Sequence, residues 1–352
     1  MTAVKNPARI ASVATALPPY RADQETASRY FRRHYGERLS RGSLAVLDKV
    51  LGHGSIRTRH FAVENPDCLV DEDPDLRVER YTRWAVNLSA EAARKALCGA
   101  KTDAEDISAL VVNTCTGYLC PGLTSYLIEN LGLPRDVRGY DLVGSGCGGA
   151  LPALGVGRGH LASSGGAALL VSVEICSATF QVGDDRSLLV SNALFGDGAA
   201  AAVLRDGPGG LEIINSASCH MPEERDKIRY VYRGGKLHNQ LSPALPGVVA
   251  GAVADVVEDM LGQAGVTKGE VAHWAFHTGG DKILGEIRER LSLREEAMAP
   301  SRRVLERCGN ISSPTVWFSL RDILDGGVKP GELIAMVTFG AGLSAHGCLL
   351  RV

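Results

Sequence analysis

The sequence predicts a layered α/β fold in two similar halves, and the first observation behind this is alternation. Apolar runs rich in β-branched residues alternate along the chain with segments of helical periodicity, a pattern typical of α/β proteins. The strand-like runs cover 109–114, 137–143, 168–173, 199–204, 272–276, 333–339 and 347–352. The clearest helical segments cover 123–131, 149–162, 248–264, 282–291 and 315–324. An earlier apolar run, 10–17, ends at two prolines and is interpreted as a first buried strand.

The second observation is a coarse internal repeat of order and chemistry. In the first half, strand 109–114 precedes a glycine turn that carries Cys147 into a helix, and Phe-Gly-Asp-Gly then leads into an alanine-rich strand. In the second half, strand 272–276 ends at His277, Cys-Gly-Asn opens a helix, and Phe-Gly-Ala-Gly leads into a last strand. We therefore predict two similar halves, 1–207 and 208–352, whose glycine turns face one shared cleft. The boundary falls at Pro208-Gly209-Gly210, where the composition loosens.

Composition excludes several classes of protein. The chain has 352 residues, of which 45% are hydrophobic and 22% charged, so it can bury a substantial core. Its formal net charge is -2 with scattered basic residues, which argues against nucleic-acid binding. Charged residues or histidine interrupt every apolar stretch before it could span a bilayer. The nine cysteines form no CxxC pair and no metal-ligand cluster, which predicts no metal site and is typical of reduced thiols in the cytosol.

Cys147 is the candidate nucleophile. It lies in Gly144-Ser145-Gly146-Cys147-Gly148-Gly149, after a predicted strand and at the start of a predicted helix. Backbone N–H groups and the positive end of the helix dipole stabilise a thiolate there and can lower the thiol pKa from about 8.5 toward neutrality. The flanking glycines allow a sharp turn and the close approach of a thioester. The alternative is a small buried cysteine in a helix–strand turn.

The same segment also spells the dinucleotide-binding fingerprint. Gly144, Gly146 and Gly149 form G-x-G-x-x-G, and Glu174 ends a predicted strand more than 20 residues later, as a ribose-binding acid would. However, the fingerprint lies in mid-chain, and a cysteine side chain would project where the pyrophosphate should bind. A noncatalytic dinucleotide-binding protein therefore stays as an alternative of a different class.

His277 and Asn310 are the partners that we predict for Cys147. His277 follows a strand and precedes Thr278-Gly279-Gly280, the kind of strand end at which catalytic side chains are displayed. Asn310 follows Gly309 and precedes Ile-Ser-Ser-Pro, which has the chemistry of a helix N-terminus. A satisfied core histidine and an ordinary helix N-cap are the alternatives. A thiol, an imidazole and a carboxamide, each at the mouth of an element, favour catalysis.

These motifs, in this order, resemble the type III polyketide synthases, the chalcone synthase-like family. The resemblance covers nearly the whole chain from about Ile10 and rests on the Cys147 turn and on segments 195–200, 277–280, 309–313 and 339–343. It implies a thiolase-like fold of two halves in an αβαβα arrangement, a homodimer and a Cys-His-Asn triad. It also implies acyl-CoA starter and malonyl-CoA extender substrates, with no metal or redox cofactor.

The resemblance implies a role for each triad residue. Cys147 would accept the starter acyl group, and His277 would keep the sulfur ionised as an ion pair. His277 and Asn310 would donate hydrogen bonds to the malonyl thioester carbonyl and stabilise the enolate that forms when carbon dioxide leaves. Decarboxylative Claisen condensation on Cys147, repeated and followed by cyclisation, would give the polyketide. Starter, number of extensions and mode of ring closure are not determined by the sequence.

The resemblance also suggests pocket positions. Phe195 resembles an aromatic gatekeeper, Cys120 a residue presented across the dimer interface, and the remaining positions lie on the walls, with ordinary core packing as the alternative. The wall positions are Cys115, Cys176, Thr179, Ser312, Gly340 and Gly342. A polar residue near Asn239 replaces the family's second gatekeeping aromatic. Thr278 and Ala341 stand where plant-type members usually have proline, which indicates a bacterial-type relative. Candidates to hold the coenzyme A phosphates are Lys49, Arg57 and Arg59.

Two other enzyme classes share parts of this pattern. A ketoacyl-ACP synthase III-like enzyme has the same fold and triad but condenses once and takes malonyl from acyl carrier protein; His277-Thr278-Gly279-Gly280 disfavours it. Papain-like proteases also place Cys, His and Asn in this chain order. The glycines around Cys147 and the lack of a secretory signature or disulfide framework argue against a protease.

Overall fold

A nine-stranded mixed sheet runs through the molecule. The computed structural model describes residues 8–233 and 236–352. The strand order is β11-β12-β13-β8-β1-β7-β6-β4-β5. The strands are β1 (Arg9–Ala16), β4 (Ile107–Asn113), β5 (Arg138–Leu142), β6 (Ala167–Glu174), β7 (Gly198–Arg205), β8 (Leu211–His220), β11 (Val271–Phe276), β12 (Leu333–Gly340) and β13 (Ser344–Arg351).

The strand order repeats within this sheet. β4-β6-β7-β1 in the first part of the chain corresponds to β11-β12-β13-β8 in the second. In both series the first pair of strands is parallel and the next two pairs are antiparallel. The two series join where Arg9 and Ile10 of β1 pair with Glu212 and Leu211 of β8. The turn between β7 and β8 contains the proposed boundary of the halves at 207/208.

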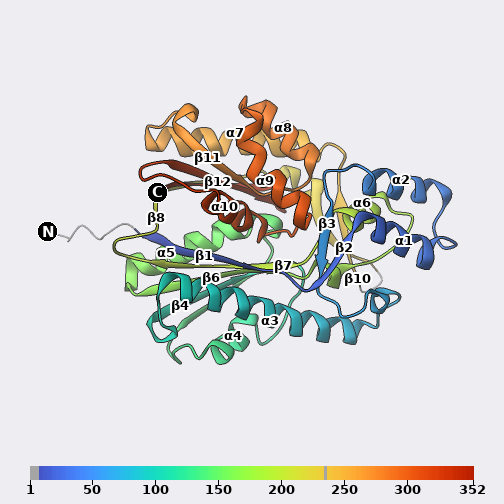
Figure 1. Cartoon of the computed structure of the whole chain (residues 1–352), viewed down its shortest axis with the longest axis horizontal. Coiled ribbons are helices and arrows are strands. Elements are labelled where there is room, and N and C mark those ends of the chain that lie inside the picture. The colour runs from blue at the N-terminus through green and yellow to red at the C-terminus, as the bar shows by residue number, and fades with distance from the viewer. Residues whose placement is uncertain (1–7, 234–235) are drawn as a thin grey trace.

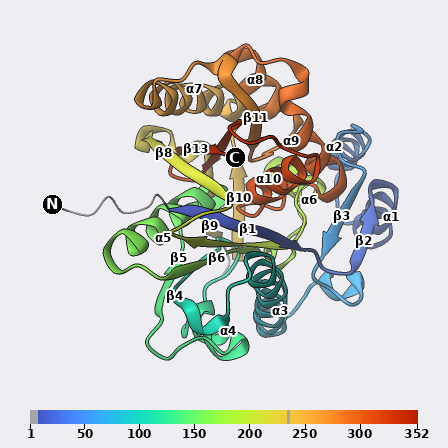
Figure 2. The same cartoon turned by 60° about the vertical axis from the view of Figure 1, so that its left-hand side comes forward.

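Helices separate and cover the two series of strands, which gives five layers (Figure 1). Helices α5 (Ala150–Ser164) and α10 (Thr315–Asp325) pack between the series in one buried cluster that includes strands of both. Helices α3 (Pro74–Ala100) and α4 (Leu123–Leu131) cover the outer face of the first series. Helices α7 (Leu245–Ala264) and α8 (Asp281–Leu291) cover the opposite outer face, as Figure 2 also shows, and α9 (Glu295–Cys308) borders both the central and this outer cluster.

Helix α3 illustrates how the sequence builds a layer. Asp73 caps its N-terminus by accepting hydrogen bonds from the backbone N–H groups of Asp75 and Leu76, and Pro74 occupies the first turn. Its buried face is rich in alanine, including Ala85 and Ala92, which are fully buried. Small side chains let the helix lie close to β1 and β7, so this layer is thin and rigid.

A smaller unit stands at one end of the sheet (Figure 1). Helices α1 (Gln24–Tyr35), α2 (Arg41–Leu51) and α6 (Arg186–Leu194) share a separate apolar cluster. The two-stranded sheets β2 (Tyr20–Asp23) with β3 (Thr58–Phe61), and β9 (Ile228–Arg233) with β10 (Lys236–Leu241), complete this end. It borders the ends of the strands that carry the candidate catalytic residues.

All the strands and helices predicted from the sequence are present, with ends within three residues of the predicted bounds. Helices α1, α2, α3, α6 and α9 and strands β2, β3, β8, β9 and β10 were not among those predictions. Within the described ranges, no helix is long and apolar enough to cross a membrane. The same ranges hold no group of three or more His, Cys, Asp or Glu side chains suited to a metal ion.

Candidate active site

The loop that carries Cys147, residues 143–149, is here called the nucleophile loop. It connects β5 to α5 through a short 3-10 turn, Gly146–Gly148, and Gly144 and Gly146 adopt positive φ values of 90° and 54°. Only glycine takes such angles without strain. The loop packs against the end of β12, where a Cβ atom added at Gly340 would lie 2.5 Å from the Ser145 carbonyl oxygen. Cys147 is consequently held in a buried position, with 8% of its surface exposed.

His277 lies at the end of β11, as predicted. Its backbone N–H donates to the carbonyl of Val337 on β12, and its ring packs edge-on against Phe339 with centroids 4.8 Å apart. Only 1% of the residue is exposed. Within the described part of the chain, its Nδ1 atom is buried without a hydrogen-bond partner. The imidazole is therefore fixed by packing and keeps a free polar atom.

Asn310 occupies a different structural context from the one predicted. Helix α9 ends at Cys308 and α10 begins at Thr315, so Asn310 does not open a helix and is not an N-cap. It forms a β-bridge with Phe195. Its Oδ1 accepts a hydrogen bond from the Ser312 backbone N–H at 2.8 Å, and its Nδ2 is 3.4 Å from the carbonyl oxygen of Gly279. The carboxamide thus joins the turn after His277 to Ser312.

Ser312 is the point at which these residues meet. Its hydroxyl donates to Cys147 Sγ at 3.1 Å and also lies 3.3 Å from Glu174 Oε1. It has one hydrogen, so it satisfies one of these acceptors at a time. Ser312 adopts a left-handed backbone conformation with φ of 56°, which is uncommon outside glycine and is characteristic of functional sites. The sequence placed Ser312 on the pocket wall, but it did not reveal this central position.

Glu174 is the acidic residue of the site. Its two oxygens accept hydrogen bonds from one backbone N–H and several hydroxyl groups, and the residue is fully buried. The donors are Cys115 N, Thr114 Oγ1, Thr116 Oγ1, Ser312 Oγ and Ser313 Oγ. A fully buried carboxylate whose oxygens are occupied by protein donors cannot accept a hydrogen bond from the ribose of a dinucleotide. The interpretation of Glu174 as a ribose-binding acid is therefore wrong.

Burial sets the protonation of the site. It raises the pKa of the Cys147 thiol to about 12; the Ser312 hydrogen bond opposes this shift and the Glu174 charge adds to it. Burial also lowers the pKa of His277 to about 3, against a small opposing effect of the Ser312 backbone. The sequence suggested a thiol pKa lowered by the helix N-terminus, but loss of water outweighs that effect here. Burial therefore disfavours the thiolate form of Cys147 and the imidazolium form of His277.

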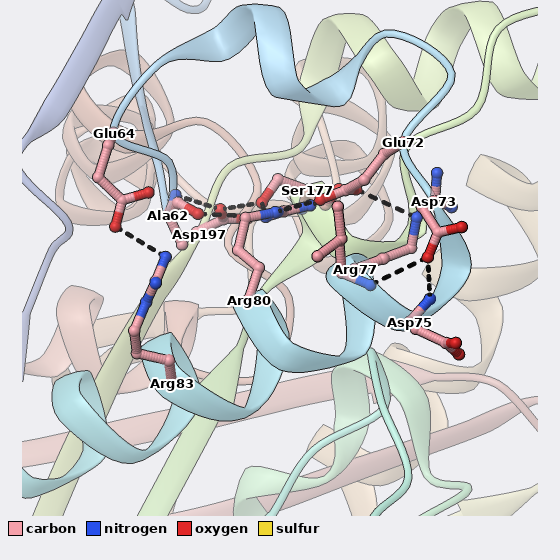
Figure 3. A network of polar contacts seen from close by, with 11 residues as sticks. Ala62, Glu64, Glu72, Asp73, Asp75, Arg77, Arg80, Arg83, Ser177 and Asp197 are labelled. Carbon is pink, nitrogen blue, oxygen red and sulfur yellow. Dashed lines mark hydrogen bonds and ion pairs between the residues drawn. The ribbon is translucent and has the colours of Figure 1, made fainter.

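A buried polar network, which we call the Arg80 clamp, fixes one wall of the site (Figure 3). Asp197, from the Phe-Gly-Asp-Gly motif, accepts hydrogen bonds from Ala62 N at 2.6 Å, Ser177 N at 2.8 Å and Ser177 Oγ at 2.6 Å. Arg80 on α3 donates to both carboxylate oxygens of Glu72, at 2.7 and 2.9 Å, and to the Ser177 carbonyl at 3.1 Å. The clamp holds the short turn Cys176–Thr179, which bears two of the predicted wall residues.

Three of the predicted pocket residues line one cavity. Phe195, Cys176 and Thr179 share it with Tyr230 and with Asn239, the polar residue that we placed at the second gatekeeper position. Tyr230 was not among the predicted site residues. Its position on the short strand β9 gave no sequence signal.

The other predicted pocket residues lie elsewhere. Cys115 Sγ is 3.4 Å from Ser312 Oγ, whereas Cys120 is exposed on the surface of the chain. Gly340 backs the nucleophile loop, and the three atoms nearest to a Cβ added at Gly342 would belong to Ser344, at van der Waals distance.

One candidate for holding the coenzyme A phosphates is contradicted. Arg59 is 1% exposed, and its guanidinium donates to the backbone carbonyls of Asn192 and Phe195 and to Gln24. It braces the β-bridge region and cannot reach a ligand on the surface. Lys49 and Arg57 are exposed, and Arg57 pairs with Glu306.

Comparison with known proteins gives consistent similarities along the chain. Residues 19–210 match the family model for FAE1/Type III polyketide synthase-like proteins, and residues 212–352 match that for the C-terminal domain of chalcone and stilbene synthases. The 3,5-dihydroxyphenylacetyl-CoA synthase of Streptomyces toyocaensis is 33% identical over 303 residues, 82% of this chain and 77% of the relative.

Solved structures agree over the full length. The structure of PKS-I from the brown alga Ectocarpus siliculosus has a TM-score of 0.91 at 30% identity, with both chains covered completely. The structure of 1,3,6,8-tetrahydroxynaphthalene synthase from Streptomyces coelicolor, a bacterial type III polyketide synthase, has a TM-score of 0.89 at 26% identity. It covers 97% of this chain and 99% of the other.

Proposed function

This chain belongs to the type III polyketide synthase family, and from that premise we propose that Cys147, His277 and Asn310 are its catalytic residues. As an acyltransferase of this family, it condenses an acyl-CoA starter with malonyl-CoA and cyclises the product. The observation that carries the assignment is the convergence on Ser312, which contacts Cys147 through its hydroxyl and Asn310 through its backbone. His277 completes the set beside Phe339, whose neighbour Gly340 backs the nucleophile loop.

Loading of the starter is the first step that we assign. The Cys147 sulfur attacks the thioester carbonyl of the starter, its proton passes to His277, and the bond to coenzyme A breaks. The leaving coenzyme A thiolate takes the proton back from His277. Burial disfavours the charged form of both residues, which favours transfer of the proton during attack over the standing ion pair that the family resemblance implied.

Asn310 and His277 then act on the extender. A malonyl thioester whose carbonyl accepts hydrogen bonds from Asn310 Nδ2 and from the neutral imidazole loses carbon dioxide to give an enolate. Asn310 Nδ2 has two hydrogens, and the Gly279 carbonyl at 3.4 Å accepts one of them, so the second is available for this role. The enolate carbon attacks the Cys147 thioester, which forms the new carbon–carbon bond and releases the Cys147 sulfur.

We also propose a homodimer joined at strand β5. This strand is one edge of the large sheet, and Val143, which follows it directly, is 57% exposed. Tyr118, in the segment after the neighbouring strand β4, is 76% exposed. Unpaired edges and exposed large apolar side chains are typical of interfaces. Cys120, exposed close by in sequence, would lie at this interface. Sedimentation equilibrium would give twice the monomer mass, and a monomer at micromolar concentration would contradict the proposal.

We propose two further assignments, the cellular location of the protein and the bounds of its two halves. All nine cysteines are free thiols in the structure, which supports a reducing compartment and hence a cytoplasmic location. The repeated strand order supports halves at 1–207 and 208–352 within one fold.

The experiment that tests the catalytic assignment uses radiolabelled malonyl-CoA with a panel of acyl-CoA starters. Wild-type protein should form an acyl adduct on Cys147, release carbon dioxide and give extended products. Cys147→Ala should lose both adduct and products. Cys348→Ala, which truncates a fully buried cysteine of β13, is the matched control and should retain them. An adduct on another cysteine would overturn the assignment of Cys147.

A further inference from the structure

A cavity extends from the catalytic end of the molecule to helix α1. Its inner end is lined by Cys176, Thr179 and Phe195. Its other end lies between Ala27 and Phe31 of α1 and the segment of residues 63–69. Phe195 lines the inner end and pairs through its backbone with Asn310, so the cavity begins directly beside the site.

The electrostatics agree with this placement. The charged form of Cys147 is among the causes that raise the pKa of both Cys176 and Tyr230, two residues of the lining. Interactions of this kind require proximity in a buried environment. Burial is the larger cause of both shifts, and Cys147 itself does not line the cavity. The backbone bridge between Phe195 and Asn310 is the geometric link that brings the mouth of the cavity next to the site.

The polar groups of the lining offer little to a polar ligand. Asn239 Nδ2 donates to Ser191 Oγ at 3.0 Å, and Asn192 Nδ2 donates to the Gln181 carbonyl at 2.6 Å. Thr179 Oγ1 donates to the Cys176 carbonyl at 2.9 Å. Because these groups already have partners, they add little to binding, and a ligand gains mainly by burying apolar surface. The Tyr30 hydroxyl differs, since it belongs to the lining and is buried without a hydrogen-bond partner within the described residues, so it remains available to a polar atom of a ligand.

The Arg59 guanidinium and the Ser177 hydroxyl in the wall of the cavity also have protein partners. The Arg59 guanidinium, which lines the wall, is occupied by backbone carbonyls, and no carboxylate pairs with it in the described chain. Ser177 is held by Asp197 and Arg80 in the Arg80 clamp. The clamp also fixes Glu72, just after the segment that forms the far end. The walls are thus set before a ligand arrives.

The free space is small. The cavity has a free volume of about 70 Å³ and is lined by 21 residues. Several water molecules, or a short alkyl chain in their place, fit such a volume. A fused ring system would have to displace walls that the clamp holds in place.

From these observations we propose that this cavity binds the aliphatic tail of a medium-chain acyl-CoA starter while its carbonyl is attached to Cys147. This inference rests on the proposed function and names the substrate class of the same site. Ala27 and Leu69, which are 8% and 7% exposed, bound the far end of the cavity and set the length of tail that fits.

The test compares kcat/KM for acetyl-, hexanoyl-, octanoyl-, palmitoyl- and benzoyl-CoA at fixed malonyl-CoA. For the wild type, kcat/KM should be about tenfold or more higher for hexanoyl- or octanoyl-CoA than for acetyl-CoA, since apolar pocket contacts usually give discrimination of this size. Ala27→Leu fills the far end and should lower the octanoyl-to-acetyl ratio by about tenfold. Leu69→Ala enlarges it and should shift the optimum toward longer tails.

The control is Leu39→Ala, the same truncation as Leu69→Ala at the same exposure of 7%, in the apolar cluster that contains Ala27 but outside the cavity lining. It should leave the order of starters unchanged. A higher kcat/KM for benzoyl- than for hexanoyl-CoA would overturn the inference. The inference would also be overturned if Ala27→Leu lowered kcat/KM for every starter and the rate of malonyl-CoA decarboxylation by the same factor. That result would show that the cavity holds the pantetheine arm of coenzyme A. Failure of every starter to load Cys147 would instead refute the proposed function.

Discussion

The Ser312 hydroxyl is the contact by which the protein most directly tunes Cys147, and Ser312→Ala removes it. The donor lies 3.1 Å from Sγ and opposes the rise in thiol pKa that burial causes. A hydrogen bond to a charged group contributes about 1.5–3 kcal/mol. At 1.36 kcal/mol per pKa unit, its loss should raise the pKa of Cys147 by about one to two units.

The expected consequence is slower reaction of the thiol at any pH below its pKa. The thiolate is the reactive form, so its fraction, and the alkylation rate with it, should fall about tenfold to hundredfold in Ser312→Ala. The assay measures the rate of Cys147 modification by iodoacetamide between pH 7 and 9.5, followed by peptide mass spectrometry. The profile should keep its slope and move to higher pH.

Ser313→Ala is the matched control, because Ser313 donates to Glu174 at 2.6 Å and has no hydrogen bond to Cys147. It removes the same atom from the neighbouring residue and should change the alkylation rate much less. An unchanged or faster rate in Ser312→Ala, with Ser313→Ala behaving as expected, would refute the reasoning. The hydroxyl would then serve Glu174, its other acceptor, instead of the sulfur.

Other predictions concern the clamp, the nucleophile loop and acid stability. Asp197→Asn leaves buried donors without a charged acceptor and should lower the free energy of unfolding, measured with urea, by about 3–5 kcal/mol. Arg83→Gln removes an exposed ion pair and should lower the same free energy by less than about 1 kcal/mol. Gly340→Ala should displace the nucleophile loop and lower kcat about a hundredfold. Gly247→Ala, where an added methyl group meets no atom within 4 Å, should leave turnover unchanged. Burial lowers the pKa of His346 to about 4, so the unfolded chain binds the proton more tightly and stability falls as pH drops from 6.5 to 4. Titration of His346 should lower the free energy of unfolding by about 2 kcal/mol at pH 5 relative to pH 8. His346→Gln should therefore make the free energy of unfolding depend less steeply on pH. An unchanged dependence would show that other groups determine it.

The elements near the catalytic residues were predictable because their sequence signals are strong. Strands such as β6 are buried on both faces and are nearly continuous apolar runs, and α4 keeps a clear helical period up to a glycine with positive φ. Helix α3 was harder because its 27 residues mix arginine and glutamate with the alanines of its buried face. Strand β8 alternates buried and exposed residues weakly, and its place is fixed by pairing with β13 and β1.

By itself, the sequence determined the layered α/β class, the order of the elements around the site, and Cys147, His277 and Asn310 as candidates. It could do so because glycine turns and residues at strand ends are local features, and their order along the chain is visible without a structure. Only the tertiary structure decided what depends on burial and on contacts between distant segments. It placed Ser312 between Cys147 and Glu174, removed Arg59 from the surface and raised the thiol pKa that the helix start alone would have lowered. Removing a charged side chain from water changes its free energy more than a nearby helix terminus does. Burial depends on the whole fold, so the sequence around Cys147 could not reveal it.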